Sequence, residues 1–224
     1  MWSDLGPQLL PAFWMTIKLT VLSAIGALIW GTVLAGMAVG PVPIMRWFAT
    51  TYVNVVRNTP LTLIVLFCSM GLYINLSLAL AGEGPDFTKN NNFRLAVLAF
   101  IVYTSAFVCE TLRSGFNTVP VGQAEAARAL GLPFLQVLRM IILPQAFRAV
   151  IGPLGSVLIA LTKNTTIASV IGVAEASLLM KSMIETHADA LFQIFGIIAL
   201  GFVILTLPVG VLFTYLGNRW AVRR

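Results

Sequence analysis

The sequence predicts an all-α membrane protein with five transmembrane helices, and three observations support this fold class. Only 10% of its 224 residues are charged, and the mean hydropathy is +0.93, values unlike those of a soluble domain. Its apolar runs are long enough to cross a hydrocarbon core, which takes about 20 helical residues. Several separate runs of this length favour helices over a β-barrel.

Five apolar segments are predicted to span the membrane. They cover roughly Phe13 to Val39, Leu61 to Ala81, Leu95 to Leu112, Ala149 to Val173 and Leu191 to Leu216. The first is not expected to be a cleavable signal peptide, because it lacks a basic start and is too long. Cys68 and Cys109 fall within apolar segments, so both are expected to be small buried residues without a disulfide.

The distribution of charge predicts the side that each connection faces. One set of connections carries nine arginines: Arg46, Arg57, Arg113, Arg128, Arg139, Arg148, Arg219, Arg223 and Arg224. The other set carries three basic residues and six of the eight acidic ones. The positive-inside rule therefore predicts an N-terminus outside and a C-terminus in the cytoplasm. The same rule accounts for the net charge of +6, so no nucleic acid partner is expected.

The long cytoplasmic connection, residues 113–148, is predicted to contain a short helix from Gly122 to Leu130. Its alanines are strong helix formers with little side-chain bulk. Gly131 is placed to end the helix in a left-handed conformation, and Pro133 prevents its continuation. Such a helix could enter a groove on another protein, and a helix lying on the bilayer surface is the alternative.

The stretch from Glu125 to Pro144 resembles the EAA loop of the permease subunits of ABC importers. The matching residues are Glu125, Ala126, Ala127, Gly131, Ile141, Leu143 and Pro144. The resemblance implies a type I ABC importer permease fold, in which 1–224 form one permease domain and 113–148 a coupling loop. It also implies that the helix, with Glu125 and Arg128 at its rim, docks into a cytoplasmic ATPase.

This resemblance implies several partners and a division of labour among them. ATP and Mg would be bound by the ATPase, since this chain has no GxxxxGK[ST] sequence, and this chain is not expected to be an enzyme. An extracellular binding protein would deliver the substrate. A second, different permease chain would complete a heterodimer in the cell membrane. Closure of the ATPase would open the spans outward, and hydrolysis would reverse the movement.

Three further stretches narrow the resemblance. "RNTPLTLIVLF", "TSAFVCETLRSGFNTVPVGQ" and "LTKNTTIASVIGVAEASLLMK" are similar to the polar amino acid subfamily. The chain looks most like the membrane subunit of actinobacterial glutamate uptake systems, which implies glutamate as substrate. Asn58 and Ile64 depart from the subfamily, in which many members have Gly and Gln at these places.

Lys163 lies inside the fourth apolar segment and is followed by Asn164, Thr165 and Thr166. A charged group there costs at least about 2.5 kcal/mol unless it faces a cavity or a partner. One interpretation is a lining for an amino acid in transit, with Lys163 near its carboxylate. The other is a structural lysine bonded to backbone carbonyls at a helix break.

Other polar residues near the apolar segments are further candidates. Asn58, Thr59 and Tyr103 are assigned to the substrate path, although a lone tyrosine more often bonds a neighbouring helix. Glu110 and Arg113 are predicted to form an i, i+3 ion pair at the membrane interface.

Two alternative functions remain open on the sequence alone. The first is a stand-alone proton-coupled carrier or channel that uses Lys163 as its intramembrane charge. The second is a membrane scaffold without transport activity. No metal site is expected, because the single histidine, His187, has no cysteine or histidine near it in the sequence.

Overall fold

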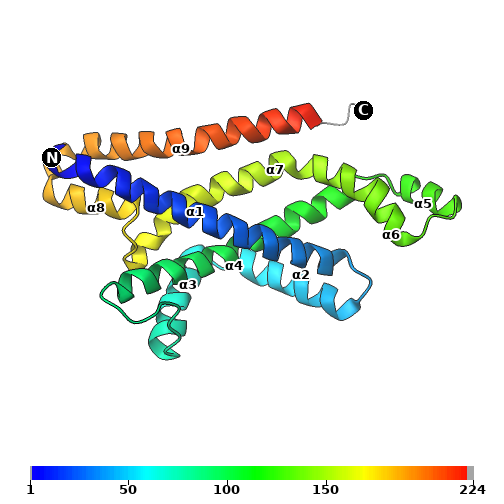
Figure 1. The fold of residues 1–224 in the computed structure, drawn as a ribbon, viewed down its shortest axis with the longest axis horizontal. Helices are drawn as coiled ribbons and strands as arrows, with labels where there is room; N and C mark the ends of the chain where they lie inside the picture. The colour runs from blue at the N-terminus through cyan, green and yellow to red at the C-terminus, as the bar shows by residue number, and fades with distance from the viewer. Residues whose placement is uncertain (1, 221–224) are drawn as a thin grey trace.

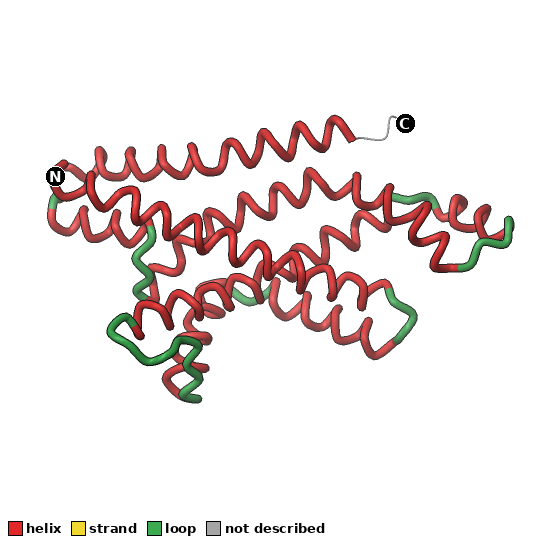
Figure 2. The backbone as a smooth tube through the Cα atoms, viewed as in Figure 1, coloured by secondary structure: helices red, strands yellow, loops and turns green. Residues whose placement is uncertain are grey.

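The computed structural model describes residues 2–220, and every regular element in this range is helical, as predicted. Four long helices set the shape of the molecule. They are α1 (Trp2–Val39), α4 (Phe87–Asn117), α7 (Leu143–Asn164) and α9 (Leu191–Trp220). Figures 1 and 2 show these helices running along the same long axis.

Shorter elements connect the long helices. Before α4 the chain forms α2 (Pro43–Arg57), α3 (Leu61–Leu66) and the π-helix η1 (Phe67–Asn75). Between α4 and α7 lie α5 (Val121–Ala129), α6 (Phe134–Val137) and the π-helix η2 (Leu138–Ile142). After α7 come the 3₁₀ helix η3 (Thr165–Ile171), α8 (Ala176–Thr186) and the 3₁₀ helix η4 (Ala188–Ala190).

The described residues contain four single helices that are long and apolar enough to cross a membrane, within residues 4–39, 87–117, 138–171 and 188–219. Helix α2 and the α3–η1 segment are together long and apolar enough for a fifth span, although the chain bends by 103° between them. Four of the five predicted spans therefore correspond to these long helical segments, and the second corresponds to part of the bent pair.

The second predicted span starts where α3 starts, at Leu61, but its predicted end and the connection before it were wrong. Residues before Leu61, which were assigned to a cytoplasmic connection, form helix α2, which packs against α1 and α4. The helix also stops at Asn75, well before Ala81. The apolar residues beyond it are not helical, and Asn91 of α4 satisfies two of their backbone groups: its Oδ1 accepts from the N–H groups of Leu80 and Ala81 at 2.8 and 3.3 Å.

Helix α4 lies at the centre of the bundle and packs most closely against α1. A Cβ atom added to Gly31 of α1 would lie 2.6 Å from Cβ of Val108 on α4. The contact therefore depends on the missing side chain. The Gly36–Gly40 pair looks like a packing motif in the sequence, but no atom of another helix lies near Gly36. Cys68 and Cys109 are buried and unpaired, as expected.

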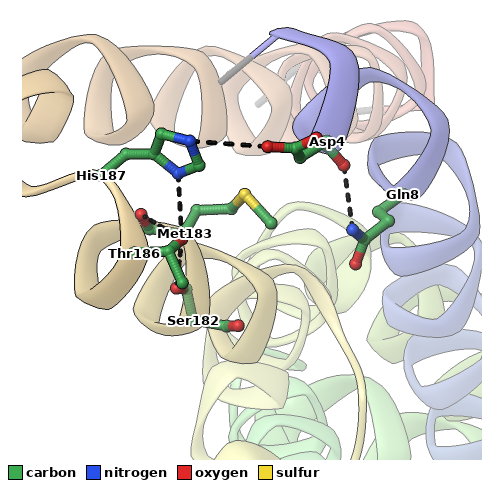
Figure 3. A network of polar contacts seen from close by, with 6 residues as sticks. All are labelled: Asp4, Gln8, Ser182, Met183, Thr186 and His187. Atoms are coloured by element: carbon green, nitrogen blue, oxygen red, sulfur yellow. Dashed lines mark hydrogen bonds and ion pairs between the residues drawn. The ribbon is translucent and has the colours of Figure 1, made fainter.

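At one end of the bundle, the N-terminal part of α1 is tied to the junction between α8 and α9. His187 Nε2 lies 3.5 Å from Asp4 Oδ2, and His187 Nδ1 lies 2.9 Å from the Thr186 hydroxyl. Figure 3 shows this network together with Gln8, whose amide donates to the Asp4 carbonyl. Arg223 and Arg224, which contributed to the charge asymmetry, lie outside the described residues.

Candidate functional site: a projecting helix and a groove between α4 and α7

Helix α5 is the element that the EAA stretch forms, and it projects at the end of the molecule opposite the N-terminus (Figure 1). Ala127 is 3% exposed and attaches the helix to the rest of the chain. Glu125, Ala126 and Arg128 are exposed on the remaining surface. Leu130, at its C-terminal cap, is 83% exposed. The helix thus presents a mixed small, charged and apolar surface.

Gly131 ends α5 in the way that the sequence predicts. Its φ angle is +84°, in the left-handed region. The N–H of Leu132 donates to the carbonyl of Ala127 at 3.2 Å, and that of Gly131 donates to Arg128 at 2.9 Å. This pair of bonds is the Schellman motif, which satisfies carbonyls at the end of a helix. The chain direction after α5 is therefore fixed by a defined cap.

The remaining residues of the EAA match lie at the beginning of the following span. Ile141 belongs to the π-helix η2, whereas Leu143 and Pro144 are the first two residues of α7. Proline is tolerated at this place because the first helical N–H groups have no partner within the helix. The match therefore covers two separate pieces of structure, the projecting helix and the base of a membrane span.

A hydrogen bond that the sequence analysis missed joins these two pieces. Gln145 Nε2 donates to Gln123 Oε1 at 2.7 Å and to the carbonyl of Ile141 at 3.0 Å. Gln123 lies on α5 and Gln145 on α7, 22 positions further along the chain. A lone glutamine pair at this spacing gives no signal in the sequence, since either side chain could equally face water.

A groove of mixed apolar and polar lining runs between α4 and α7 in two parts. One part has a volume of about 270 Å³ and is lined by residues that include Tyr103, Phe107 and Asn164. The other, of about 220 Å³, is lined by residues that include Glu110 and Ser114. On α4, the lining residues recur once per helical turn from Tyr103 to Thr118, so they share one face of the helix. Polar side chains on a membrane helix favour a path for a polar solute.

The four residues of the predicted "KNTT" lining lie where α7 ends and η3 begins, and only one of them lines the groove. Asn164 lines the groove, whereas Lys163 is exposed and is absent from its walls. The Thr165 hydroxyl donates to the carbonyl of Thr162 at 2.7 Å, and Thr166 donates to that of Lys163 at 2.8 Å. These hydroxyls are therefore engaged by the backbone at the helix break.

Asn58 and Thr59 lie at the bend between α2 and α3, and both side chains bond to the end of α2. Asn58 Nδ2 donates to the carbonyl of Asn54 at 2.7 Å, and Thr59 Oγ1 donates to that of Val55 at 2.8 Å. Together with Pro60, which lacks an N–H, they mark the break in the second span.

The partner predicted for Glu110 was wrong. Glu110 Oε1 forms an ion pair with Nη1 of Arg57, the last residue of α2, and Arg113 is exposed. A pair within one helix was expected because the sequence alone places Arg57 in a cytoplasmic connection. Since α2 packs against α4, Arg57 reaches Glu110 from another helix.

Comparisons with known proteins identify the family. Residues 27–222 match the family model described as the binding-protein-dependent transport system inner membrane component. The chain belongs to this family. The permease is 66% identical to the glutamate transport system permease protein GluC of Corynebacterium glutamicum, over 100% of this chain and 99% of that protein. It is 34% identical to a probable glutamine ABC transporter permease, GlnM of Bacillus subtilis, over 92% and 90% of the two chains.

A solved structure has the same architecture. The permease superposes on a chain from the crystal structure of an amino acid ABC transporter with histidines. The TM-score is 0.85 and the sequence identity is 28%, with 97% of this chain and 96% of that chain covered. The permease is therefore the membrane-spanning component of an ABC importer in the cytoplasmic membrane. It is not the ATPase of that importer, and it works with an ATPase and a binding protein.

Proposed function

We propose that this permease transports glutamate, and that 113–148 of its single domain, 1–224, transmit ATPase movement to the spans. The observation that supports this most strongly is the 66% identity, along the whole chain, to a glutamate transport permease. A second Corynebacterium protein with the same name, from Corynebacterium efficiens, is 65% identical. Relatives named for glutamine and arginine are only 34–36% identical.

The coupling step uses the surface of α5. Glu125, Ala126 and Arg128 are exposed there and available to an ATPase, while Ala127 faces inward. Ile141, Leu143 and Pro144 carry a movement of α5 into η2 and α7, because the Gln123–Gln145 hydrogen bond ties α5 to the start of α7. The ATPase would hold ATP and Mg, and its closure would bring the α5 helices of two permeases together.

The substrate path follows the groove between α4 and α7. Tyr103 and Asn164 line it directly. Lys163, one residue before Asn164, provides a positive charge near one end that attracts an acidic amino acid. Thr165, Thr166, Asn58 and Thr59 contribute by shaping the ends of α7 and α2, since their hydroxyl or amide groups bond the backbone there.

A second, different permease chain covers the open side of this groove and forms a heterodimer with this one. The groove is open along its length, and exposed polar atoms facing lipid would be costly. The N-terminus lies outside and the C-terminus in the cytoplasm, as the arginine distribution predicts. Alternating access then exposes the groove first to the binding protein and afterwards to the cytoplasm.

The substrate assignment is tested by uptake into proteoliposomes that contain this chain, the second permease and the ATPase, with the binding protein outside. Labelled glutamate, glutamine, aspartate and arginine are compared at equal concentration, with ATP inside. We expect glutamate to be taken up at least about tenfold faster than arginine, because Lys163 and the binding protein both favour an acidic substrate. Faster uptake of another amino acid would overturn the glutamate assignment and leave the importer intact.

A further inference from the structure

The ion pair between Arg57 and Glu110 lies beside the α4–α7 groove. Glu110 lines the part of about 220 Å³. The guanidinium carbon of Arg57 lies 5.7 Å from the ring centroid of Phe107, and Phe107 lines the part of about 270 Å³. Glu110 therefore lines the proposed path, and Arg57 lies next to it through its contacts with Glu110 and Phe107.

Both partners keep hydrogen-bonding capacity that the pair does not use. Their side chains are 40% and 46% exposed. Among the described residues, the guanidinium bonds only to Glu110, through Nη1, although it has five N–H donors. Glu110 likewise accepts from Arg57 through Oε1 and leaves Oε2 without a protein donor in this part of the chain. An incoming ligand can reach either group without breaking the pair.

The surroundings orient the guanidinium as a recognition group. Phe107 covers its face, as in a cation–π contact, and a second ring, Tyr103, lies 4.9 Å from that of Phe107. A guanidinium whose face is occupied directs its N–H edge elsewhere, and this edge matches a carboxylate with two parallel hydrogen bonds. A charged pair inside a membrane protein is also more often functional than structural.

We propose that Arg57 and Glu110 recognise the backbone charges of the transported amino acid. The Arg57 guanidinium binds the α-carboxylate, and Glu110 binds the α-ammonium group. The two charges of the pair are opposite to those of a zwitterion, so each backbone charge of the ligand meets a group of opposite sign. This inference rests on the proposed amino acid transport, and it assigns recognition of the shared backbone to a place separate from Lys163.

The test measures equilibrium binding of labelled glutamate to the complete permease–ATPase complex in nanodiscs, without the binding protein. Arg57→Lys keeps the charge but loses the planar fork, and we expect it to weaken binding at least about tenfold. Arg46→Lys is the matched control on the same helix, since Arg46 bonds the Gly40 carbonyl outside the groove. It should bind as the wild type does. Binding by Arg57→Lys equal to that of the wild type would overturn the proposal.

Exchanging the two charged residues distinguishes a role in ligand recognition from a purely structural role of the ion pair. The double variant Arg57→Glu with Glu110→Arg restores an ion pair between α2 and α4 but inverts its direction. We expect the complex to assemble with its ATPase and to bind glutamate at least about tenfold more weakly. Restored wild-type affinity would mean that the pair only holds the two helices together.

A ligand comparison needs no variant and therefore does not depend on folding. Glutamine keeps both backbone charges, whereas its isomer isoglutamine has an amide in place of the α-carboxylate. Competition by glutamine at least about tenfold stronger than by isoglutamine supports the proposal. Equal competition, or no glutamate binding by the wild-type complex, overturns it. If the proposed transport function itself were wrong, the result would be different: the wild-type complex would take up no amino acid even with ATP.

Discussion

Gln145 at the start of α7 donates a hydrogen bond to Gln123 on α5 across 2.7 Å. The bond connects the projecting helix directly to a membrane span, in addition to the chain that runs through α6 and η2. Gln123 is exposed, and Gln145 is half-buried. Because the bond is exposed, we expect it to add little stability and to matter mainly for passing a movement of α5 to α7.

Gln145→Leu should weaken coupling. Leucine fills similar space but cannot bond Gln123, so α5 can move without α7. We expect the uptake of glutamate per ATP hydrolysed to fall about threefold to tenfold, in keeping with the loss of about one hydrogen bond. Both rates are measured in the same proteoliposomes. Gln8→Leu, at the opposite end of the molecule, serves as control, and an equal ratio in the two variants would count against this role.

Gly131→Val should uncouple hydrolysis from uptake more strongly. The left-handed φ of +84° costs a β-branched residue roughly 1–2 kcal/mol, so the end of α5 is expected to change direction. No atom lies near the added Cβ, which limits the effect to the backbone. Gly122→Ala, also without close neighbours but on the helix itself, should be almost neutral. Normal uptake by Gly131→Val together with normal ATP hydrolysis would contradict the coupling role.

Gly31→Val should separate α1 from α4 and lower stability. The added Cβ would lie 2.6 Å from that of Val108 and 2.9 Å from the Ser105 carbonyl oxygen. Overpacking of this kind costs about 1–3 kcal/mol, which corresponds to a melting temperature lower by several degrees. The melting temperature is measured by thermal unfolding of the detergent-solubilised complex. Gly36→Val has open space and should melt near the wild type, so similar melting of both variants would refute this packing account.

The parts of the fold and of the candidate site that depend on neighbouring residues in the chain can be predicted from the sequence. Gly131 followed by Pro133 predicts the left-handed end of α5, because both residues act on the backbone next to them. The place of α2 could not be predicted from hydropathy, since Asn54 and Arg57 give the helix a polar face that resembles a connection. The Arg57–Glu110 pair joins residues 53 positions apart, and no spacing rule within one helix identifies it.

Glu175 should make the stability of the permease depend on pH. Its carboxylate is fully buried and caps α8 by accepting from the N–H groups of Ser177 and Leu178 at 2.8 and 2.9 Å. Burial raises the pKa of Glu175 from 4.5 to about 7, although these two bonds and the nearby charge of Lys181 oppose the rise. Lys89 of α4 lines the same cavity of about 380 Å³.

The direction of the effect follows from proton binding. Between about pH 4.5 and about pH 7 the folded protein binds this proton and the unfolded chain does not, so stability falls as pH rises through this window. The melting temperature of the wild type should therefore decrease across it. Glu175→Gln should lack this decrease, whereas Glu185→Gln, exposed on the same helix, should retain it. A decrease of equal size in Glu175→Gln would show that another group titrates.

Lys163→Met should impair glutamate uptake while leaving the ATPase bound. Lys163 is exposed beside Asn164, at one end of the groove, so its removal takes away attraction for an acidic solute but no packing. We expect a lower uptake rate for glutamate than for glutamine in this variant. Unchanged uptake of both would remove Lys163 from the path.

The dependence of uptake on internal ATP tests the central claim most directly. Proteoliposomes with both permeases and the ATPase are loaded with ATP and Mg or left empty, and labelled glutamate is offered with its binding protein. The account predicts accumulation against a gradient only in the loaded vesicles, and none when the ATPase is omitted. Equal accumulation in both, driven by a proton gradient alone, would contradict it and establish a self-sufficient carrier.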